Sequence, residues 1–181
     1  MEISHFFMIY LFEYKNKKRP KTHKMPTQAT YTSKYSHPDF SEEPKKSQSN
    51  TPAIYIYLQD IHESIKIILG DLFEGLAHLD VKVIFDEEEP LETALEKANM
   101  ILILNQDKKL LKKAWENGVV TITNKFTNEI ADYNPNDETG NSFIFENFNE
   151  WEIFAAVVRA LETYKFPYDW KFISRSCKKS V

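Results

Sequence analysis

The chain separates into a polar first part and a body in which short apolar runs alternate with helical patterns. Residues 1–50 are rich in Ser, Thr, Pro and Lys, with scattered aromatic residues. From about Thr51 onward the apolar residues gather in short runs, and between those runs they recur at the spacing of one helical face. This division predicts a disordered leader over 1–50 and one folded domain over 51–181.

Five apolar runs have the composition of strands that are covered on both faces. They are rich in β-branched and aromatic residues and lack the alternation of a half-exposed strand. These runs are 53–58, 81–85, 100–104, 119–123 and 143–145. Because helical segments separate most of them, the pattern predicts βαβ units and a parallel sheet with helices on both faces, which is a Rossmann-like α/β fold.

Helical spacing marks the segments between the runs and after the last one. The first predicted helix buries Ile65, Ile68, Leu69, Leu72, Phe73, Leu76 and Leu79. Pro90 opens a short second helix, and Gly118 closes a third that begins near Asp107. The long final helix is predicted to bury one face, which consists of Trp151, Phe154, Ala155, Val158, Leu161 and Tyr164. Asn149 and Glu152 form its capping pair, Pro167 ends it, and Trp170 folds back onto the body.

Charge is divided unevenly along the chain. Residues 1–50 carry nine Lys and Arg against five Asp and Glu, a net of +4, so the other 131 residues carry −8 to reach the total of −4. An acidic body does not suit a nucleic-acid-binding surface, so no nucleic-acid partner is expected. The basic run 15–21 is interpreted as a solvated tail rather than a site for nucleic acid or anionic lipid.

Neither a membrane segment nor a secretory signal is predicted. The apolar run 6–12 is too short to span a bilayer, and its basic residues follow it where a signal peptide would place them first. If translation begins at Met25, residues 1–24 are a mis-assigned start. The single cysteine, Cys177, suits a reducing cytoplasm and is expected to be a free thiol in a fraying C-terminal tail.

Three segments near the end of the chain carry a family resemblance. They are Glu138-Thr-Gly-Asn-Ser-Phe-Ile-Phe-Glu146, Arg159-Ala-Leu-Glu-Thr-Tyr164 and Pro167-Tyr-Asp-Trp170. They resemble the turn ETGxGFxFE, the segment RAL-x-x-Y and the closing Pro-x-x-Trp of bacterial glycogen and starch synthases, and residues 98–105 and 114–123 resemble the family less specifically. The resemblance implies that 51–181 is the nucleotide-sugar-binding half of a two-domain (GT-B) glycosyltransferase.

The charged groups of that family are missing here. The family places an Arg and a Lys in an R-L-x-x-Q-K-G loop after its first strand, where residues 57–64 read Tyr-Leu-Gln-Asp-Ile-His-Glu-Ser. His62 is interpreted as a surface residue at a helix start. The family's E-P-x-G loop is absent between Asn105 and Lys108, where Asp107 is expected to be a helix N-cap. Residues 124–129, Asn-Lys-Phe-Thr-Asn-Glu, replace its Gly-Gly turn.

Other chemistries find no support in the residues. No G-x-G-x-x-G follows Leu58, so the acidic run 86–89 is interpreted as a solvated loop. No His or Cys cluster has metal-ligand spacing, and a phosphoacceptor receiver domain would need an Asp at Asn105. The sequence therefore predicts no catalytic residue, metal or cofactor. The predicted ligand contacts are Asn105, Asn124, Lys125 and Thr127.

Two function classes follow. The first is a non-catalytic binding or scaffold module, a cytoplasmic pseudoenzyme whose partner is a protein, a glycan or a nucleotide sugar. The alternative is the donor-binding subunit of a split glycosyltransferase that transfers glucose from a nucleotide sugar. A decaying relic without a role is a third reading, and the intact apolar stripes argue against it.

Overall fold

Five parallel strands form the sheet at the centre of the molecule. The computed structural model describes residues 51–86 and 88–181, so the predicted leader and the start at Met25 lie outside the described residues. The strands are β1 (Ala53–Tyr57), β2 (Lys82–Phe85), β3 (Met100–Ile103), β4 (Val120–Asn124) and β5 (Ser142–Phe145). Their order is β2-β1-β3-β4-β5, with every neighbouring pair parallel. The predicted Rossmann-like fold is confirmed.

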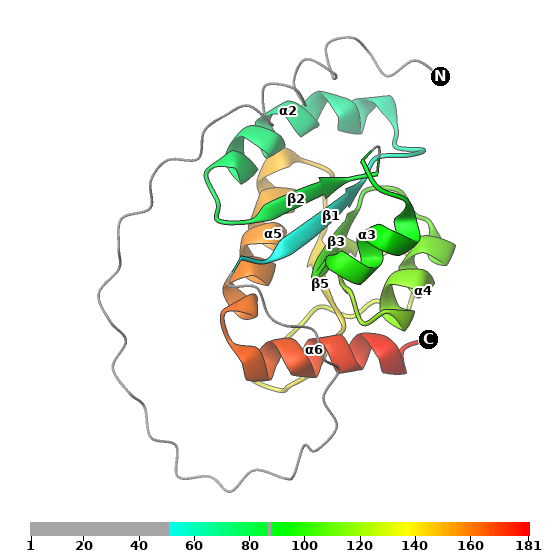
Figure 1. Cartoon of the computed structure of the whole chain (residues 1–181), viewed down its shortest axis with the longest axis vertical. Coiled ribbons are helices and arrows are strands. Elements are labelled where there is room, and N and C mark those ends of the chain that lie inside the picture. Colours follow the sequence, from blue (N-terminus) through cyan, green and yellow to red (C-terminus); the bar gives the residue numbers. More distant parts are fainter. Residues whose placement is uncertain (1–50, 87) are drawn as a thin grey trace, which may run out of the picture.

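Helices cover both faces of this sheet (Figure 1). The helices are α2 (Glu63–Ala77), α3 (Leu91–Lys97), α4 (Lys108–Glu116), α5 (Glu150–Tyr164) and α6 (Pro167–Lys179). α2 and α5 pack together on one face, and α3 and α4 lie on the other. α6 runs across the amino-end side of the sheet and packs against α4 and α5. The carboxyl ends of the strands are therefore left to loops.

The final long helix is rotated from its predicted orientation. Its buried residues are Ile153, Ala156, Val157, Ala160, Leu161 and Tyr164. Trp151 is 76% exposed and Ala155 is exposed, so their predicted inward positions are wrong. Phe154 does face inward as predicted, because its ring lies against α2 at Gly75, where a Cβ would come within 2.8 Å of Cε2. α5 also packs against β4 and β5, and these contacts with the sheet select which of the two helical stripes is buried.

Helix α6 stands where the sequence predicted a fraying tail. Pro167 occupies the first turn of α6, a position that does not require a backbone N–H. Cys177 is fully buried on this helix, and its Sγ donates to the Asn141 carbonyl at 3.1 Å. Burial raises the pKa of the thiol to about 12. Cys177 is a free thiol as predicted, but the predicted fraying tail around it is wrong. Trp170 does fold back as predicted, edge-on to Tyr164 with ring centroids 5.0 Å apart.

The predicted capping pair at the start of α5 is confirmed. Glu152 N donates to Asn149 Oδ1 at 2.9 Å, and Asn149 Nδ2 donates back to Glu152 Oε1 at 3.0 Å. Glu152 also accepts from the backbone N–H groups of Asn147 and Glu146 at 2.7 and 3.1 Å. Hydrogen bonds from Asn147 and then Asn149 lower the pKa of Glu152 to about 2. This carboxylate therefore ties the β5–α5 loop to the helix.

We expect this cap to make folding sensitive to acid. Because the folded-state pKa lies below the ordinary value of 4.5, the ionised cap stabilises the fold above about pH 4.5, and this contribution is lost as the pH falls through about 2. Glu152→Gln should therefore lower the free energy of unfolding at pH 7 and flatten its decline between these two pH values. Urea unfolding across the acid range measures both effects. Glu150→Gln, in the same turn, is the matched control, and a slope unchanged in Glu152→Gln would contradict the prediction.

Candidate functional site

The strand order reverses between β1 and β3, and open α/β sheets bind ligands outside the carboxyl ends of the strands at such a point. Here a side chain joins the two loops. Asn105, just beyond β3, donates from Nδ2 to the backbone carbonyl of Gln59 in the β1–α2 loop at 3.0 Å. The Leu58 N–H donates to Asp86 Oδ2 at 3.2 Å, which ties the same loop to the end of β2. Hydrogen bonds within the chain thus occupy the point where the strand order reverses.

Carboxylates surround a tyrosine at this edge. The phenol of Tyr57 donates to Gln59 Oε1 at 3.3 Å. Burial raises its pKa, and the negative charges of Asp107, Asp60 and Asp86 raise it further. Asp60 lies in the β1–α2 loop itself and adopts the left-handed region at φ 56°. The loop that would meet a donor diphosphate is therefore acidic, and it would repel phosphate.

Buried oxygen atoms without donors lie beside this acidic edge. Asn105 Oδ1, Asn124 Oδ1 and Thr123 Oγ1 have no hydrogen-bond partner among the described residues. Asn124 is only 8% exposed and Thr123 is fully buried. β3 and β4 are neighbours, with Ile103 opposite Thr123, so these residues follow adjacent strands. The two amide oxygens only accept and therefore suit hydroxyl or amide donors better than a phosphate, whereas the Thr123 hydroxyl can also donate.

The four predicted ligand contacts fall at this edge with different exposures. Asn124 is buried, Asn105 and Thr127 are partly buried, and Lys125 is exposed. Lys125 is the one cation among them. Thr127 lies beside Glu129, and its hydroxyl is the first cause that lowers the pKa of that carboxylate. Asn105 and Asn124 follow or end adjacent strands, and Lys125 and Thr127 lie in the loop after β4, where the Thr127 hydroxyl interacts with Glu129.

Two residues that family chemistry would place near the ligand have helix-capping roles. His62 Nδ1 accepts from the Ser64 N–H at 3.3 Å at the start of α2. Asp107 Oδ1 accepts from the N–H groups of Lys109 and Leu110 at 2.7 and 3.2 Å at the start of α4. Both interpretations made from the sequence are confirmed. Over residues 51–86 and 88–181, no group of three His, Cys, Asp or Glu is placed to hold a metal ion.

The signature turn has a structural role. Asn134 and Thr139 exchange backbone hydrogen bonds at 2.9 and 3.3 Å, which closes a tight turn. Asp132 accepts from the Ile144 N–H at 2.8 Å and pairs with Arg159 at 2.6 Å, so it joins the turn to β5 and α5. Gly140 has φ 97° and lies so close to Asp132 that a Cβ would come within 2.2 Å of its carbonyl oxygen. The residues that resemble the synthases thus hold the fold together.

Sequence reasoning missed several residues of this edge. Tyr57 and Thr123 were assigned only to strands, and Asp86 only to a solvated loop. Their position in the sequence could have indicated this role. Each lies at or next to the end of a parallel strand, and the carboxyl ends of parallel strands meet at one edge of the sheet. Strand order was needed to tell which of these ends are neighbours.

Comparison with known proteins adds no relative to this picture. No protein-family model matches the chain, and no curated protein is significantly similar to it. In the part of the chain that the structure describes, no helix has the length and apolar character to cross a membrane.

Proposed function

We propose that this protein is a glycogen or starch synthase-like domain that has lost catalysis and acts as a non-catalytic binding or scaffold module. One observation carries the proposal. Asp60, Asp86 and Asp107 all raise the pKa of Tyr57 at the edge where a nucleotide-sugar diphosphate would lie. A donor would need cations in that place, because negative charge grows on the diphosphate as the glycosidic bond breaks.

The size of the electrostatic loss supports a non-catalytic role. Each missing stabilising contact to a developing charge raises a barrier by on the order of 3 kcal/mol. The family pattern has an Arg and a Lys after the first strand, and this chain has Gln59 and Asp60 in the corresponding loop. Two lost cations correspond to a rate lower by roughly four orders of magnitude before the added repulsion of the carboxylates is considered.

The retained and replaced residues divide by role, which supports descent from a synthase. The retained Gly140 and Arg159 act on the turn and on α5. The replaced residues lie at the carboxyl edge, where Asn105 now bonds to the β1–α2 loop. A glycan or a protein donor group fits the acceptor oxygens of this edge better than a phosphate does. We propose a cytoplasmic location from the reduced, buried Cys177.

Thermal unfolding of the full chain with nucleotide sugars tests this proposal. A ligand present at about a hundred times its dissociation constant stabilises a fold by about 2.7 kcal/mol, which moves a midpoint by several degrees. We expect no such shift with millimolar ADP, UDP, ADP-glucose or UDP-glucose. A clear shift with one of the two sugars would overturn the proposal and favour the donor-binding subunit of a split glycosyltransferase.

If a nucleotide sugar does raise the unfolding midpoint, two variants show whether it binds at the carboxyl edge. Lys125→Gln removes the exposed cation of the carboxyl edge, while Lys82→Gln removes an exposed lysine of β2, an edge strand of the sheet. A nucleotide sugar bound at the candidate site would lose its effect in the first variant and keep it in the second. Equal responses would show that binding is elsewhere or reflects only net charge.

A further inference from the structure

Most of the unpaired positive charge of the described chain lies on two helices. The ion pairs of the described residues include Lys66–Glu63, Lys97–Glu89, Lys113–Glu92, Arg159–Asp132 and Lys165–Glu162. Five lysines that belong to none of these pairs are exposed on α4 and α6. They are Lys108, Lys109, Lys112, Lys178 and Lys179, and we call them the lysine face.

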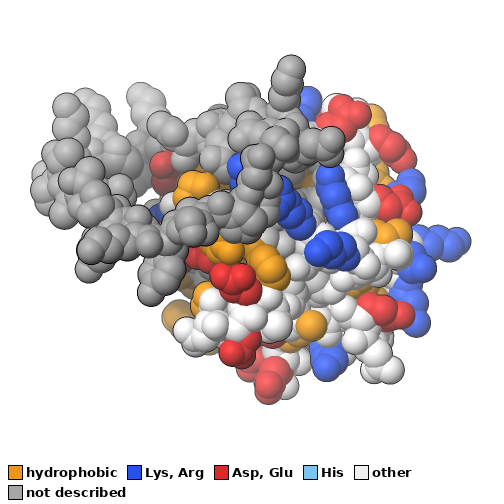
Figure 2. All heavy atoms as spheres, turned by 90° about the horizontal axis from the view of Figure 1, so that it is seen from below, with side chains coloured by type: hydrophobic (Ala, Val, Ile, Leu, Met, Phe, Trp, Pro, Cys, Tyr) orange, Lys and Arg blue, Asp and Glu red, His pale blue; other side chains and the backbone are white. Residues whose placement is uncertain are grey.

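The net charge of α4 and α6 differs greatly from that of the rest of the domain. α4 carries four Lys and one Glu, a net of +3, and α6 carries four Lys and Arg and one Asp, also +3. Because residues 51–181 carry −8, the remainder outside these two helices carries −14. Figure 2 looks at the molecule from the side of α6 and shows Lys and Arg side chains at the centre and right of this surface, with Asp and Glu side chains among those at the right. Net positive charge is thus concentrated on α4 and α6.

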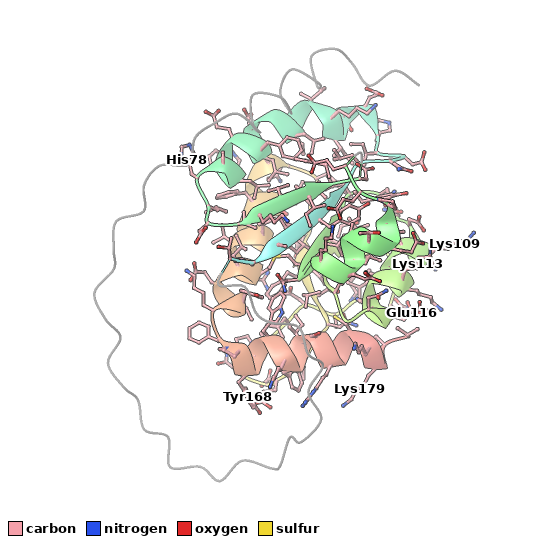
Figure 3. The ribbon with its side chains drawn as sticks, viewed as in Figure 1. His78, Lys109, Lys113, Glu116, Tyr168 and Lys179 are labelled. Carbon is pink, nitrogen blue, oxygen red and sulfur yellow. The ribbon has the colours of Figure 1, made fainter. Side chains whose placement is uncertain are left out.

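Several contacts bring the two helices together at their C-terminal ends. Ser174 on α6 donates to the Gly118 carbonyl, just after α4, at 2.6 Å. The Lys178 stem crosses Gly118, where a Cβ would come within 2.5 Å of its Cε. Figure 3 shows Lys109 on α4 and Lys179 near the end of α6, with Glu116 of α4 labelled between them. The lysine face therefore extends over both helices and includes one carboxylate of α4.

A second path links the middle of α4 to the end of α6. Lys108 and Lys112 both lower the pKa of Glu129, so they lie on its side of α4. The backbone carbonyl of Glu129 accepts from Asn141 Nδ2 at 2.8 Å, and the same nitrogen donates to Ser180 Oγ at 2.9 Å. Glu116 of α4 and its N-cap Asp107 are further acids of this region, and together with Glu129 these three carboxylates do not neutralise the five cations.

The arrangement weakens α4. Lys108 and Lys109 stand in its first turn, where cations oppose the helix dipole and the N-cap carboxylate of Asp107 offsets them only in part. Lys108 and Lys112 are four residues apart, as are Lys109 and Lys113, and like charges at this spacing destabilise a helix. An anionic partner would remove both penalties. The penalties therefore favour a binding role over a merely solvated surface.

We propose that the lysine face binds an acidic segment of a protein partner. α6 has 13 residues and is about 20 Å long, a distance that about six extended residues cover. A short Asp- and Glu-rich segment can therefore lie along the face without meeting the acidic remainder. A nucleic acid is longer and wider, and it would extend over surface of net charge −14, which repels it. The inference does not depend on whether the carboxyl edge binds a nucleotide sugar.

Fluorescence anisotropy with the full chain tests the proposal. The probe is a peptide of about eight residues with alternating Glu and Ser and a neutral dye, at an ionic strength of about 20 mM, where exposed charges are weakly screened. We expect binding that disappears at about 0.5 M salt. Lys112→Gln combined with Lys179→Gln should weaken binding by about fivefold or more, since each exposed pair contributes modestly. Lys112→Arg with Lys179→Arg should keep it.

The matched control removes the same charge elsewhere. Lys66→Gln combined with Lys82→Gln changes the net charge equally on α2 and β2 and should weaken binding by less than about twofold. Equal weakening by the two double variants would overturn the proposal, as would absence of peptide binding at millimolar concentration. An oligonucleotide of about eight thymidines that binds more tightly than the peptide would assign the face to nucleic acid instead.

Discussion

Replacement of Gly140 by alanine is expected to destabilise the domain by about 3 kcal/mol or more, a decrease of roughly 10 °C in Tm. Gly140 has φ 97°, a conformation that L side chains rarely adopt. An added Cβ would also lie 2.2 Å from the Asp132 carbonyl oxygen and 2.7 Å from Tyr133 Cα. These neighbours are backbone atoms, so no side-chain rotation relieves the clash. Urea or thermal unfolding of the full chain measures the effect.

Gly70→Ala is the control for this substitution. Gly70 lies within α2 and does not have the positive φ of Gly118 and Gly140. Alanine is the better helix former, so the control should gain about 0.5–1 kcal/mol of stability. If Gly140→Ala changed stability as little as the control does, the turn would not be fixed by the approach of Gly140 to Asp132.

Loss of the Asn141 side chain should have the second large effect. Asn141 is 4% exposed, and its Oδ1 accepts from the Ala131 N–H at 3.0 Å. Its Nδ2 donates to the Glu129 carbonyl and to Ser180 Oγ. Asn141→Ala leaves these buried groups without partners, and we expect a loss of about 2–4 kcal/mol in the free energy of unfolding. Denaturant unfolding monitored by tryptophan fluorescence tests this value.

The comparison for Asn141 is an asparagine of the same turn region. Asn136 is exposed, and Asn136→Ala should change stability by no more than about 0.5 kcal/mol. Because Asn141 joins the 129–131 loop to the end of α6, hydrogen exchange should also increase in both segments of the Asn141→Ala variant. A similar small change in both variants would mean that Asn141 is dispensable and that α6 is held by its apolar contacts alone.

The two substitutions test a broader feature of the molecule, which is the division between its two ends. The signature turn, α5 and α6 form a network of hydrogen bonds and close backbone contacts. The carboxyl edge of β1 to β4 instead has carboxylates and acceptor oxygens without donors. A domain that loses catalysis but still has to fold would keep the first set of residues and tolerate change in the second. That expectation is the physical basis of the proposed function.

The sequence by itself determined the strands, the helices before α6 and several of the helix caps. Continuous apolar runs showed five buried strands to within one residue at each end, because a parallel sheet covered on both faces needs apolar side chains in both directions. Asp107, Asn149 and Gly118 were assigned as helix-end residues from local patterns alone. Local chemistry sufficed there, since a cap acts on backbone groups two or three residues away.

Only the tertiary structure decided the features that depend on distant contacts. The inward face of α5 was fixed by its packing on β4, β5 and α2. The burial of Cys177 required α6 to pack on the amino-end side of the sheet. The acidic edge around Tyr57 and the lysine face each combine residues from separate elements. Periodicity predicts that a helix has an apolar face and where a strand ends, but it does not predict which other elements they contact. Those contacts are set by the fold as a whole.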